Sequence, residues 1–182
     1  ISGSNQDLTQ TTIGRRPSPN IDNFRINNFN SLYFDGIDDR LTTTFSNTLP
    51  QGFTIFIILN SPISRSQTLF DQITSPYCFL YYQQNSSKFI QNSGVSQYSN
   101  ATNGQFDFTV FEVQFNNQNS IVKKNKNPLI QGSSGNNSLS GISLASSANG
   151  GSPYLGEFVE LIVYNQNFSV AEGDSITDFL MD

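Results

Sequence analysis

Acidic side chains in the C-terminal part of the chain are the first candidates for chemistry. Hydrolysis of a glycosidic bond needs two carboxyl groups that flank it, and Glu157 and Glu160 are the nearest pair. Positions three apart on a strand point to opposite faces, so we expect that these two cannot flank one bond. Glu112 stands alone within an apolar stretch. Carboxylates from different strands could in principle converge, but nothing in the sequence indicates it.

The other usual catalytic groups are scarce. The chain has no histidine, so the commonest general base and a common zinc ligand are both missing. Cys78 is the only cysteine, so no disulfide forms within the chain, and its setting in PYCFLYY predicts a small buried side chain. No group that would activate its thiol lies near it in the sequence. We therefore predict that the protein is not an enzyme.

Three aspartates follow one another closely in the stretch FDGIDD. Asp35, Asp38 and Asp39 offer the hard oxygen ligands that calcium prefers. Asp and Gly are also the residues that a tight turn favours, and the turn alone is the interpretation that we prefer. If calcium binds, we expect Asp38 and Asp39 as its ligands, because Asp35 belongs to the preceding strand. We expect no other cofactor.

Tyrosines and amides lie together in several predicted loops and strand ends. Proteins that bind sugars combine an aromatic platform for the ring face with polar groups for the hydroxyls. The expected ligand-binding residues are Tyr98, Asn100, Asn103, Tyr82 and Gln84. Tyr98 is the strongest of them, because it lies in the polar stretch GVSQYSNATNGQ, where no periodic pattern buries it. For each single residue the alternative is a core tyrosine or a turn asparagine.

The elements that must position these residues read as strands. The sixteen Phe and seven Tyr favour pleated structure, and turn residues recur at the spacing of an antiparallel sandwich. The stretch 52–60 has apolar residues at odd and at even positions, which form the two faces of a strand. We therefore expect other elements to cover both faces. Strands are predicted at 31–45 (around a turn), 52–60, 67–72, 77–83, 87–91, 106–116, 119–124 and 156–165, with a short one at 142–144 in the otherwise loop-like stretch 133–154.

One helix is predicted, at 170–181. Ser169 followed by Glu172 forms a capping box, in which each side chain satisfies a backbone N–H at the start of the helix. Ile176, Phe179 and Leu180 then fall on one face of it.

The composition limits the partners. A net charge of -5 gives no electrostatic basis for binding nucleic acid. The Arg15–Arg16 pair, and the lysines at 123, 124 and 126 in a predicted hairpin, read as a solvated arm and turn. No run of about 18 apolar residues exists, so we expect no insertion into a membrane. The chain begins at Ile1 without a signal peptide, and we interpret it as an excised or processed piece of a larger protein.

Three stretches together resemble the laminin G-like, concanavalin A-like jelly rolls of bacterial, phage and viral surface proteins. The sequence RRPSPNIDNFRINNFNSLYFDGIDDRL (15–41) resembles the entry of that family, and GFTIFIILN with QTLFDQ follows it. The sequence YLGEFVELIVYNQNFSVAEGDSITDFL (154–180) is similar to its closing strand and capped helix. The middle departs from the family, because the chain has no Trp and reads Ile121, Val122, Lys123 where the family has its hairpin.

The resemblance implies an all-β, two-sheet antiparallel jelly-roll sandwich over residues 30–182, with one short C-terminal helix. Residues 1–29 are expected to form a polar arm or linker. Our first hypothesis is a non-catalytic carbohydrate-binding or adhesion domain of a larger viral or bacterial surface protein, at an extracellular or virion surface, with a glycan or a cell-surface receptor as partner. The alternative is a structural or decoration domain that contacts neighbouring capsid or fibre subunits, because the same sandwich serves many functions.

Overall fold

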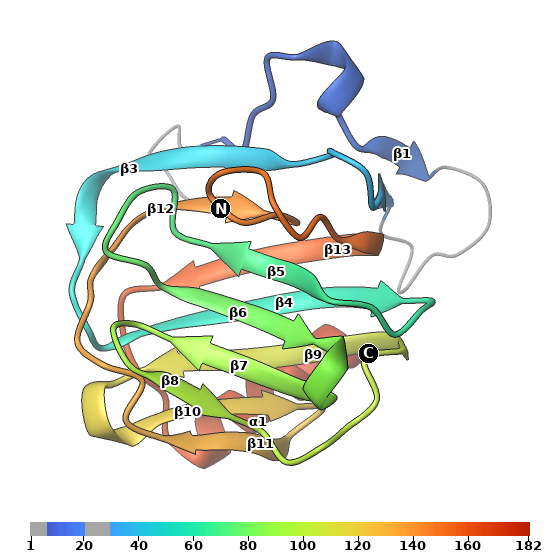
Figure 1. Cartoon of the computed structure of the whole chain (residues 1–182). Helices are drawn as coiled ribbons and strands as arrows, with labels where there is room; N and C mark the ends of the chain where they lie inside the picture. The colour runs from blue at the N-terminus through green and yellow to red at the C-terminus, as the bar shows by residue number, and fades with distance from the viewer. Residues whose placement is uncertain (1–6, 21–29) are drawn as a thin grey trace.

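The computed structural model describes residues 7–20 and 30–182, and it shows two antiparallel sheets packed face to face (Figure 1). The seven-stranded sheet has the order β1-β2-β13-β4-β9-β10-β11, and the six-stranded sheet has the order β3-β12-β5-β6-β7-β8. One α-helix, α1 (Val170–Met181), lies within the described residues. The predicted fold class, an all-β two-sheet antiparallel sandwich with a C-terminal helix, is therefore confirmed.

The chain crosses between the two sheets several times. The seven-stranded sheet contains β1 (Ser18–Asn20), β2 (Ser31–Asp35), β4 (Phe53–Ser61), β9 (Phe106–Phe115), β10 (Ser120–Lys124), β11 (Asn127–Gly132) and β13 (Leu155–Tyr164). The six-stranded sheet contains β3 (Leu41–Leu49), β5 (Gln67–Asp71), β6 (Phe79–Gln83), β7 (Lys88–Asn92), β8 (Ser96–Tyr98) and β12 (Leu139–Leu144). The 3₁₀ helix η1 (Ile13–Arg15) precedes β1, η2 (Gln84–Ser86) joins β6 to β7, and η3 (Asn117–Asn119) joins β9 to β10.

Three strands were not predicted, and each lies at the edge of a sheet. Among the described residues, β1, β8 and β11 have a partner strand on one side only. Edge strands are often short, polar or interrupted by Pro, which removes the apolar alternation that identifies a strand in a sequence. β1 and β8 have three residues each, and β1 and β11 contain Pro19 and Pro128. β12 begins at Leu139, earlier than the predicted 142–144.

The hydrophobic core fills the space between the sheets. From β4, the side chains of Phe53, Ile55, Ile57 and Leu59 point into it and are fully buried. Facing aromatic rings from both sheets pack against this row, among them Phe70 against Phe115 and Phe89 against Phe111.

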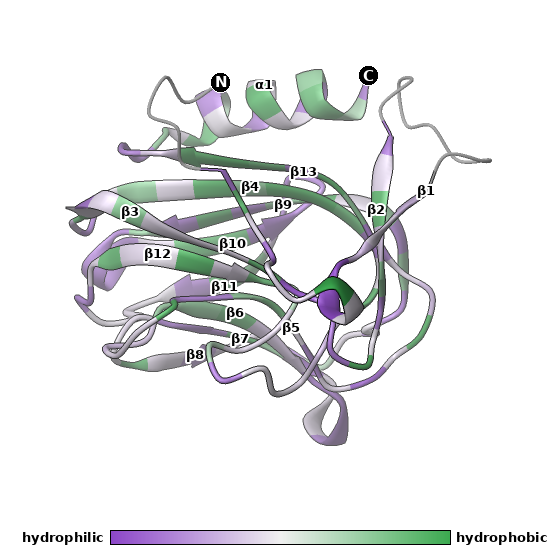
Figure 2. Cartoon of the chain, turned by 90° about the horizontal axis from the view of Figure 1, so that it is seen from above, coloured by the Kyte–Doolittle hydropathy of each residue, from purple (hydrophilic) through white to green (hydrophobic). Residues whose placement is uncertain are grey.

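The opposite face of β4 is also covered. Phe56 and Ile58 form a second apolar cluster with Val110 of β9 and Leu180 of α1. Figure 2 shows α1 lying along the outside of the sheet that contains β4, β9 and β13. The expectation that a strand apolar on both faces needs cover on both sides is confirmed. Ser169 and Glu172 form the predicted capping box at the start of the helix.

A buried ion pair fixes α1 to the sheet. The ammonium of Lys123 on β10 lies 3.0 Å from the carboxylates of both Glu112 on β9 and Asp174 on α1. The side chains of Lys123 and Glu112 are 3% and 1% exposed, so charge neutralisation is needed. Burial lowers the pKa of Lys123, but hydrogen bonds to Asp174 and Glu112 outweigh it and raise the pKa overall. The interpretation of Lys123 as a solvated turn residue, and of Glu112 as an isolated carboxylate, was wrong.

The helix approaches very closely at this point. A Cβ atom at Gly173 would lie only 2.4 Å from Oε1 of Glu112, so no larger residue fits between the helix and the carboxylate without a shift. Further along β10, the ammonium of Lys124 lies 4.7 Å from the centre of the Phe106 ring. The neighbouring Lys126 pairs with Asp178, and both of these side chains are largely exposed.

The described part of the N-terminal segment lies along the sandwich. Thr9 pairs with Thr42 of β3, and β1 joins the edge of the seven-stranded sheet beside β2. The rest of the predicted arm, 1–6 and 21–29, lies outside the described residues, and the boundary at residue 29 stays a prediction. Among the described residues, no helix has the length and the apolar character needed to cross a membrane.

We predict that replacing Lys123 with Met lowers the free energy of unfolding by about 3–5 kcal/mol, because the substitution leaves Glu112 buried without its counter-charge. Urea-induced unfolding followed by circular dichroism measures the change. The double variant Lys123→Met with Glu112→Gln should regain most of the lost stability, because no charge is then left unpaired in the interior.

The matched control is Lys126→Met, which removes an exposed ion pair with the same helix. We expect little change in stability from it, because water screens that pair. Equal effects of the two lysine substitutions would contradict a specific role for the buried pair.

Candidate functional site

The outer face of the six-stranded sheet is the open face of the sandwich. Directly paired residues on antiparallel strands point to the same side. Leu80 and Tyr82 of β6 belong to the core, so Phe79, Tyr81 and Gln83 point outward. Within the described part of the chain no α-helix lies over this face (Figure 2), in contrast to the face that carries α1.

A row of bulky side chains crosses this face. Tyr81 of β6 pairs with Ile90 of β7, and Ile90 pairs with Tyr98 of β8. Tyr98 is 55% exposed, whereas Ile90 between the two tyrosines is buried. The two rings therefore flank an apolar floor on an exposed sheet surface.

A hollow of about 270 Å³ lies at one end of the same face. Phe79 of β6 and Asp71 of β5 pair directly and form part of its wall. The loop that follows β12 supplies the opposite wall, and Tyr77, which is 51% exposed, stands at the rim. The lining residues are Asp71, Tyr77, Phe79, Ser147, Ala148 and Asn149.

A β-bulge determines that Asp71 faces outward. Thr68 pairs with Tyr81 and Asp71 pairs with Phe79, so three steps along β5 correspond to two steps along β6. Leu69 and Phe70 both point into the core as a result. Without the bulge Asp71 would point the same way as Leu69, into the apolar interior.

The carboxylate of Asp71 is held by two backbone donors. Its Oδ1 accepts the N–H of Gln72 at 2.8 Å, and its Oδ2 accepts the N–H of Ala148 at 3.0 Å. Burial raises the pKa of Asp71 above its ordinary value, and the two N–H groups lower it in part. An ionised carboxylate has about four acceptor positions, so acceptor capacity remains for hydroxyl groups of a ligand in the hollow.

The loop that forms the other wall is fixed by its own hydrogen bonds. The carbonyl oxygen of Ser147 accepts the N–H of Gly150, and the hydroxyl of Ser147 donates to Oδ1 of Asn149 at 2.6 Å. The guanidinium of Arg40 donates to the carbonyl of Ala148 at 3.4 Å. The hydroxyl and amide groups at the rim are therefore held by the surrounding backbone.

Cys78 lies close to this hollow but is fully buried, as the sequence predicted. Burial raises the pKa of its thiol to about 12, and the charge of Asp71 adds to the effect. A thiol with this pKa stays protonated at neutral pH, and only the thiolate is an effective nucleophile. The geometry gives Cys78 a packing role.

The predicted ligand-binding residues divide between the surface and the core. Tyr98 lies on the open face, on its edge strand β8. Asn100, Asn103 and Gln84 are exposed at the end of the sheet away from the hollow, where the N–H of Thr102 donates to the carbonyl of Ser87 and brings the two segments together.

The prediction that Tyr82 is a ligand-binding residue was wrong, because Tyr82 lies in the core. It is 1% exposed, its ring packs against Gly104, and its hydroxyl contacts Ser64 at 3.1 Å and the carbonyl of Thr102 at 3.2 Å. The residue therefore closes the end of the core and cannot contact a ligand on the surface.

The hollow itself was not predicted. Asp71 was read only as part of the strand QTLFDQ, and Phe79, Ser147 and Asn149 were read as ordinary strand and loop residues. The available signal was a charged residue inside an apolar run, which a fully buried strand does not tolerate without a partner.

The two carboxylates considered for catalysis lie on the same face, contrary to the prediction. Glu157 pairs with Asn60 and Glu160 pairs with Ile58, because a bulge on β13 lets three steps match two on β4. Glu157 accepts a hydrogen bond from the hydroxyl of Ser31. Neither residue lines the hollow beside Asp71 or the one beside α1.

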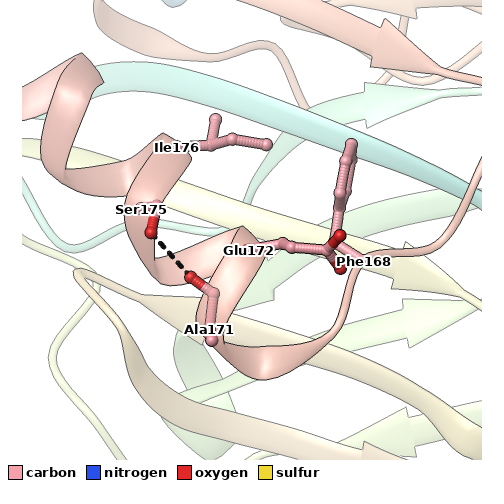
Figure 3. Close-up of a pocket in the computed structure, with 5 residues that line it drawn as sticks. All are labelled: Phe168, Ala171, Glu172, Ser175 and Ile176. Atoms are coloured by element: carbon pink, nitrogen blue, oxygen red, sulfur yellow. Dashed lines mark hydrogen bonds between the residues drawn. The ribbon is translucent and has the colours of Figure 1, made fainter.

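A second hollow of about 390 Å³ lies against the first half of α1 (Figure 3). Its surface is mainly apolar and is formed by Phe168, Ala171, Glu172, Ser175 and Ile176. The hydrogen bonds from the hydroxyl and the N–H of Ser169 lower the pKa of Glu172, whose carboxylate is used to cap the helix. The hydroxyl of Ser175 donates to the carbonyl of Ala171. The polar side chains of Glu172 and Ser175 are thus hydrogen-bonded to groups of the helix and its N-terminal cap.

The aspartates of the FDGIDD turn lie together as expected, with one carboxylate oxygen of each within 4.8 Å of the others. Asp39 accepts the N–H of Asp35, and Asp35 accepts the N–H of Ile37. Arg15 lies 3.5 Å from Asp38 and supplies a counter-charge. These contacts fit the turn interpretation, since a calcium ion at Asp38 would compete with Arg15. Calcium binding at Asp38 and Asp39 stays a prediction.

Comparison with known proteins gives a likeness of fold. No family model and no curated protein matches the sequence. One similar structure is that of botulinum neurotoxin type C, whose cell entry depends on interaction with two ganglioside molecules. The likeness covers 99% of this chain and 48% of that chain, with a TM-score of 0.67 and 11% sequence identity. The binding domain of botulinum neurotoxin DC in complex with rat synaptotagmin II is similar over 99% of this chain and 48% of its own. Its TM-score is 0.68 and its sequence identity is 12%.

A sialidase shows the same likeness over a shorter part. The sialidase of Trypanosoma rangeli in complex with the inhibitor DANA matches 83% of this chain and 28% of its own, with a TM-score of 0.62 and 11% identity. The chain thus spans less than half of the length of each of these proteins. At this level of identity the comparisons show a shared β-sandwich fold, which in these proteins forms one part of a larger chain.

Proposed function

We propose that this chain is a non-catalytic carbohydrate-binding or adhesion domain that binds a glycan on the open face of the six-stranded sheet. The observation that carries the proposal is the hollow, in which Phe79 and Tyr77 lie beside the carboxylate of Asp71 and the polar side chains of Ser147 and Asn149. Ring-sized hydroxylated ligands need this combination of an aromatic surface and fixed hydrogen-bonding groups.

The volume of the hollow agrees with a small ligand. Pockets for drug-sized molecules measure about 300–1,000 Å³, and this one has about 270 Å³. One pyranose ring is a ligand of the right size. Asp71 would accept hydrogen bonds from its hydroxyls, and the amide of Asn149 can both donate and accept.

The similar structures support a binding role. Cell entry of botulinum neurotoxin type C depends on two ganglioside molecules, and the binding domain of botulinum neurotoxin DC forms a complex with rat synaptotagmin II. Two of the structures that match nearly the whole chain are named as binding domains. A cell-surface glycan or receptor is the corresponding partner for this chain. An extracellular or virion-surface location within a larger protein belongs to the same proposal.

A structural role with no small ligand is the less favoured alternative. It calls for an arm that reaches away from the sandwich toward a neighbouring subunit. Residues 7–20 instead lie along the domain, through the pairing of Thr9 with Thr42 and of β1 with β2.

We predict that Asp71→Asn weakens glycan binding about tenfold, because it removes the charged acceptor in the hollow while keeping the size of the side chain. A glycan-array screen of the purified domain identifies the ligand, and titration calorimetry compares the two proteins. Asp107→Asn on β9 is the matched control, since that aspartate is exposed and lies on the other sheet. Unchanged affinity in a folded Asp71→Asn variant would remove the hollow as the site.

The same binding should weaken at acidic pH. A ligand whose hydroxyls donate to Asp71 prefers the ionised carboxylate, so its affinity is complete at neutral pH and falls as the pH drops through the pKa of Asp71. Because burial raises this pKa, we expect the loss to begin at a pH above the ordinary 3.8. Calorimetry between neutral pH and mildly acidic pH tests this, and the Asp71→Asn variant should show no such dependence.

A further inference from the structure

We propose that the hollow and Tyr98 are two subsites of one surface, which binds a short neutral oligosaccharide laid obliquely across β6, β7 and β8. The inference rests on the proposed function and specifies its ligand. The hollow would hold one sugar residue, and the exposed ring of Tyr98 would stack against another residue of the same chain.

The strand pairing fixes the position of Tyr98 relative to the hollow. Phe79 at the hollow pairs with Asn92, and Asn92 pairs with Ser96 on β8. Tyr98 lies two residues beyond Ser96, on the same side of the sheet. Two strand spacings across and two residues along amount to roughly 12 Å between the backbone positions of Phe79 and Tyr98. One ring cannot span this distance, so only an oligosaccharide can contact both.

The surface between the two subsites suits a sugar chain. Ile90 forms an apolar floor between Tyr81 and Tyr98. Asn92 and Ser96 form a polar line beside it. The amide of Asn92 donates to the hydroxyl of Ser96 at 2.9 Å, so this polar pair is held in place. A glycan chain presents apolar ring faces and hydroxyl edges to such a surface.

The charges of the face point to a neutral ligand. Of the described residues that line the hollow, Asp71 alone is charged, and it is 5% exposed. A carboxylate-bearing sugar placed there would meet a like charge in a partly desolvated setting, which disfavours binding. Arg40 reaches the outer side of the loop through the carbonyl of Ala148 and does not line the hollow. Lys88 pairs with Gln83, two residues beyond Tyr81 along β6 in the direction away from the hollow.

The test compares three classes of probe on the whole chain by titration calorimetry and saturation-transfer NMR. The probes are neutral methyl pyranosides (glucose, galactose, mannose and N-acetylglucosamine), neutral trisaccharides of the same sugars, and sialyllactose. We expect the best neutral trisaccharide to bind about tenfold more tightly than its monosaccharide, and sialyllactose to bind more weakly than either.

Variants separate the two subsites. Tyr98→Ala should lower trisaccharide affinity to near that of the monosaccharide and leave monosaccharide binding unchanged, while Tyr98→Phe should keep the tighter binding because the ring remains. Tyr33→Ala is the matched control, since Tyr33 is 38% exposed on the other sheet. Asp71→Asn should weaken both neutral probes.

Each contrary result has a distinct meaning. Equal affinities for monosaccharide and trisaccharide, or no effect of Tyr98→Ala, would overturn the second subsite and keep the proposed function. Preferred binding of sialyllactose would overturn the neutral ligand class while still supporting carbohydrate binding. Absence of binding to all three classes and to the glycan array, by a protein shown to be folded, would overturn both the inference and the proposed function.

Discussion

The architecture depends on β4 being apolar on both faces. Its inward row of four large side chains builds the core, and Phe56 and Ile58 on its other face require cover as well. The chain meets this requirement with its only described α-helix, which can cover only one sheet. Among the described residues, the six-stranded sheet consequently has no α-helix on its outer face (Figure 2). The need to bury one strand on both sides thus determines which surface is available to a ligand.

The cover on β4 is held by charge as well as by apolar contact. Lys123 lies between Glu112 of the sheet and Asp174 of the helix, and Gln114 donates to Glu112 at 2.6 Å and to the carbonyl of Phe168 at 3.1 Å. Buried ion pairs of this kind often add little net stability, because desolvation offsets the attraction. Their geometry is demanding, however, and here it specifies one position of α1 over the sheet, where Gly173 alone allows the approach to Glu112.

Much of the fold follows from apolar periodicity, and the failures have physical causes. The two-faced pattern of 52–60 correctly required cover on both sides, and the Ser169–Glu172 capping box correctly located the helix. The parity argument failed for Glu157 and Glu160 because a bulge on β13 adds a residue, and a bulge on β5 similarly turns Asp71 outward. A bulge depends on the pairing of two strands, so it leaves no mark in the local pattern of either one. Tyr82 was misread for the related reason that its cover, Gly104, lies in a distant loop.

The bulge on β5 also explains how a carboxylate can lie within an almost fully buried strand. All five residues of β5 are buried, and an ionised side chain in the interior would be costly without partners. The extra residue directs Asp71 out of the core, and the N–H groups of Gln72 and Ala148 replace part of its hydration. Because the second donor belongs to the loop after β12, the same contact that stabilises the charge also positions Ser147 and Asn149 around the hollow. The hydrogen bonds that stabilise the Asp71 carboxylate therefore also form a polar, ring-sized hollow. This hollow lies on the sheet face that α1 does not cover.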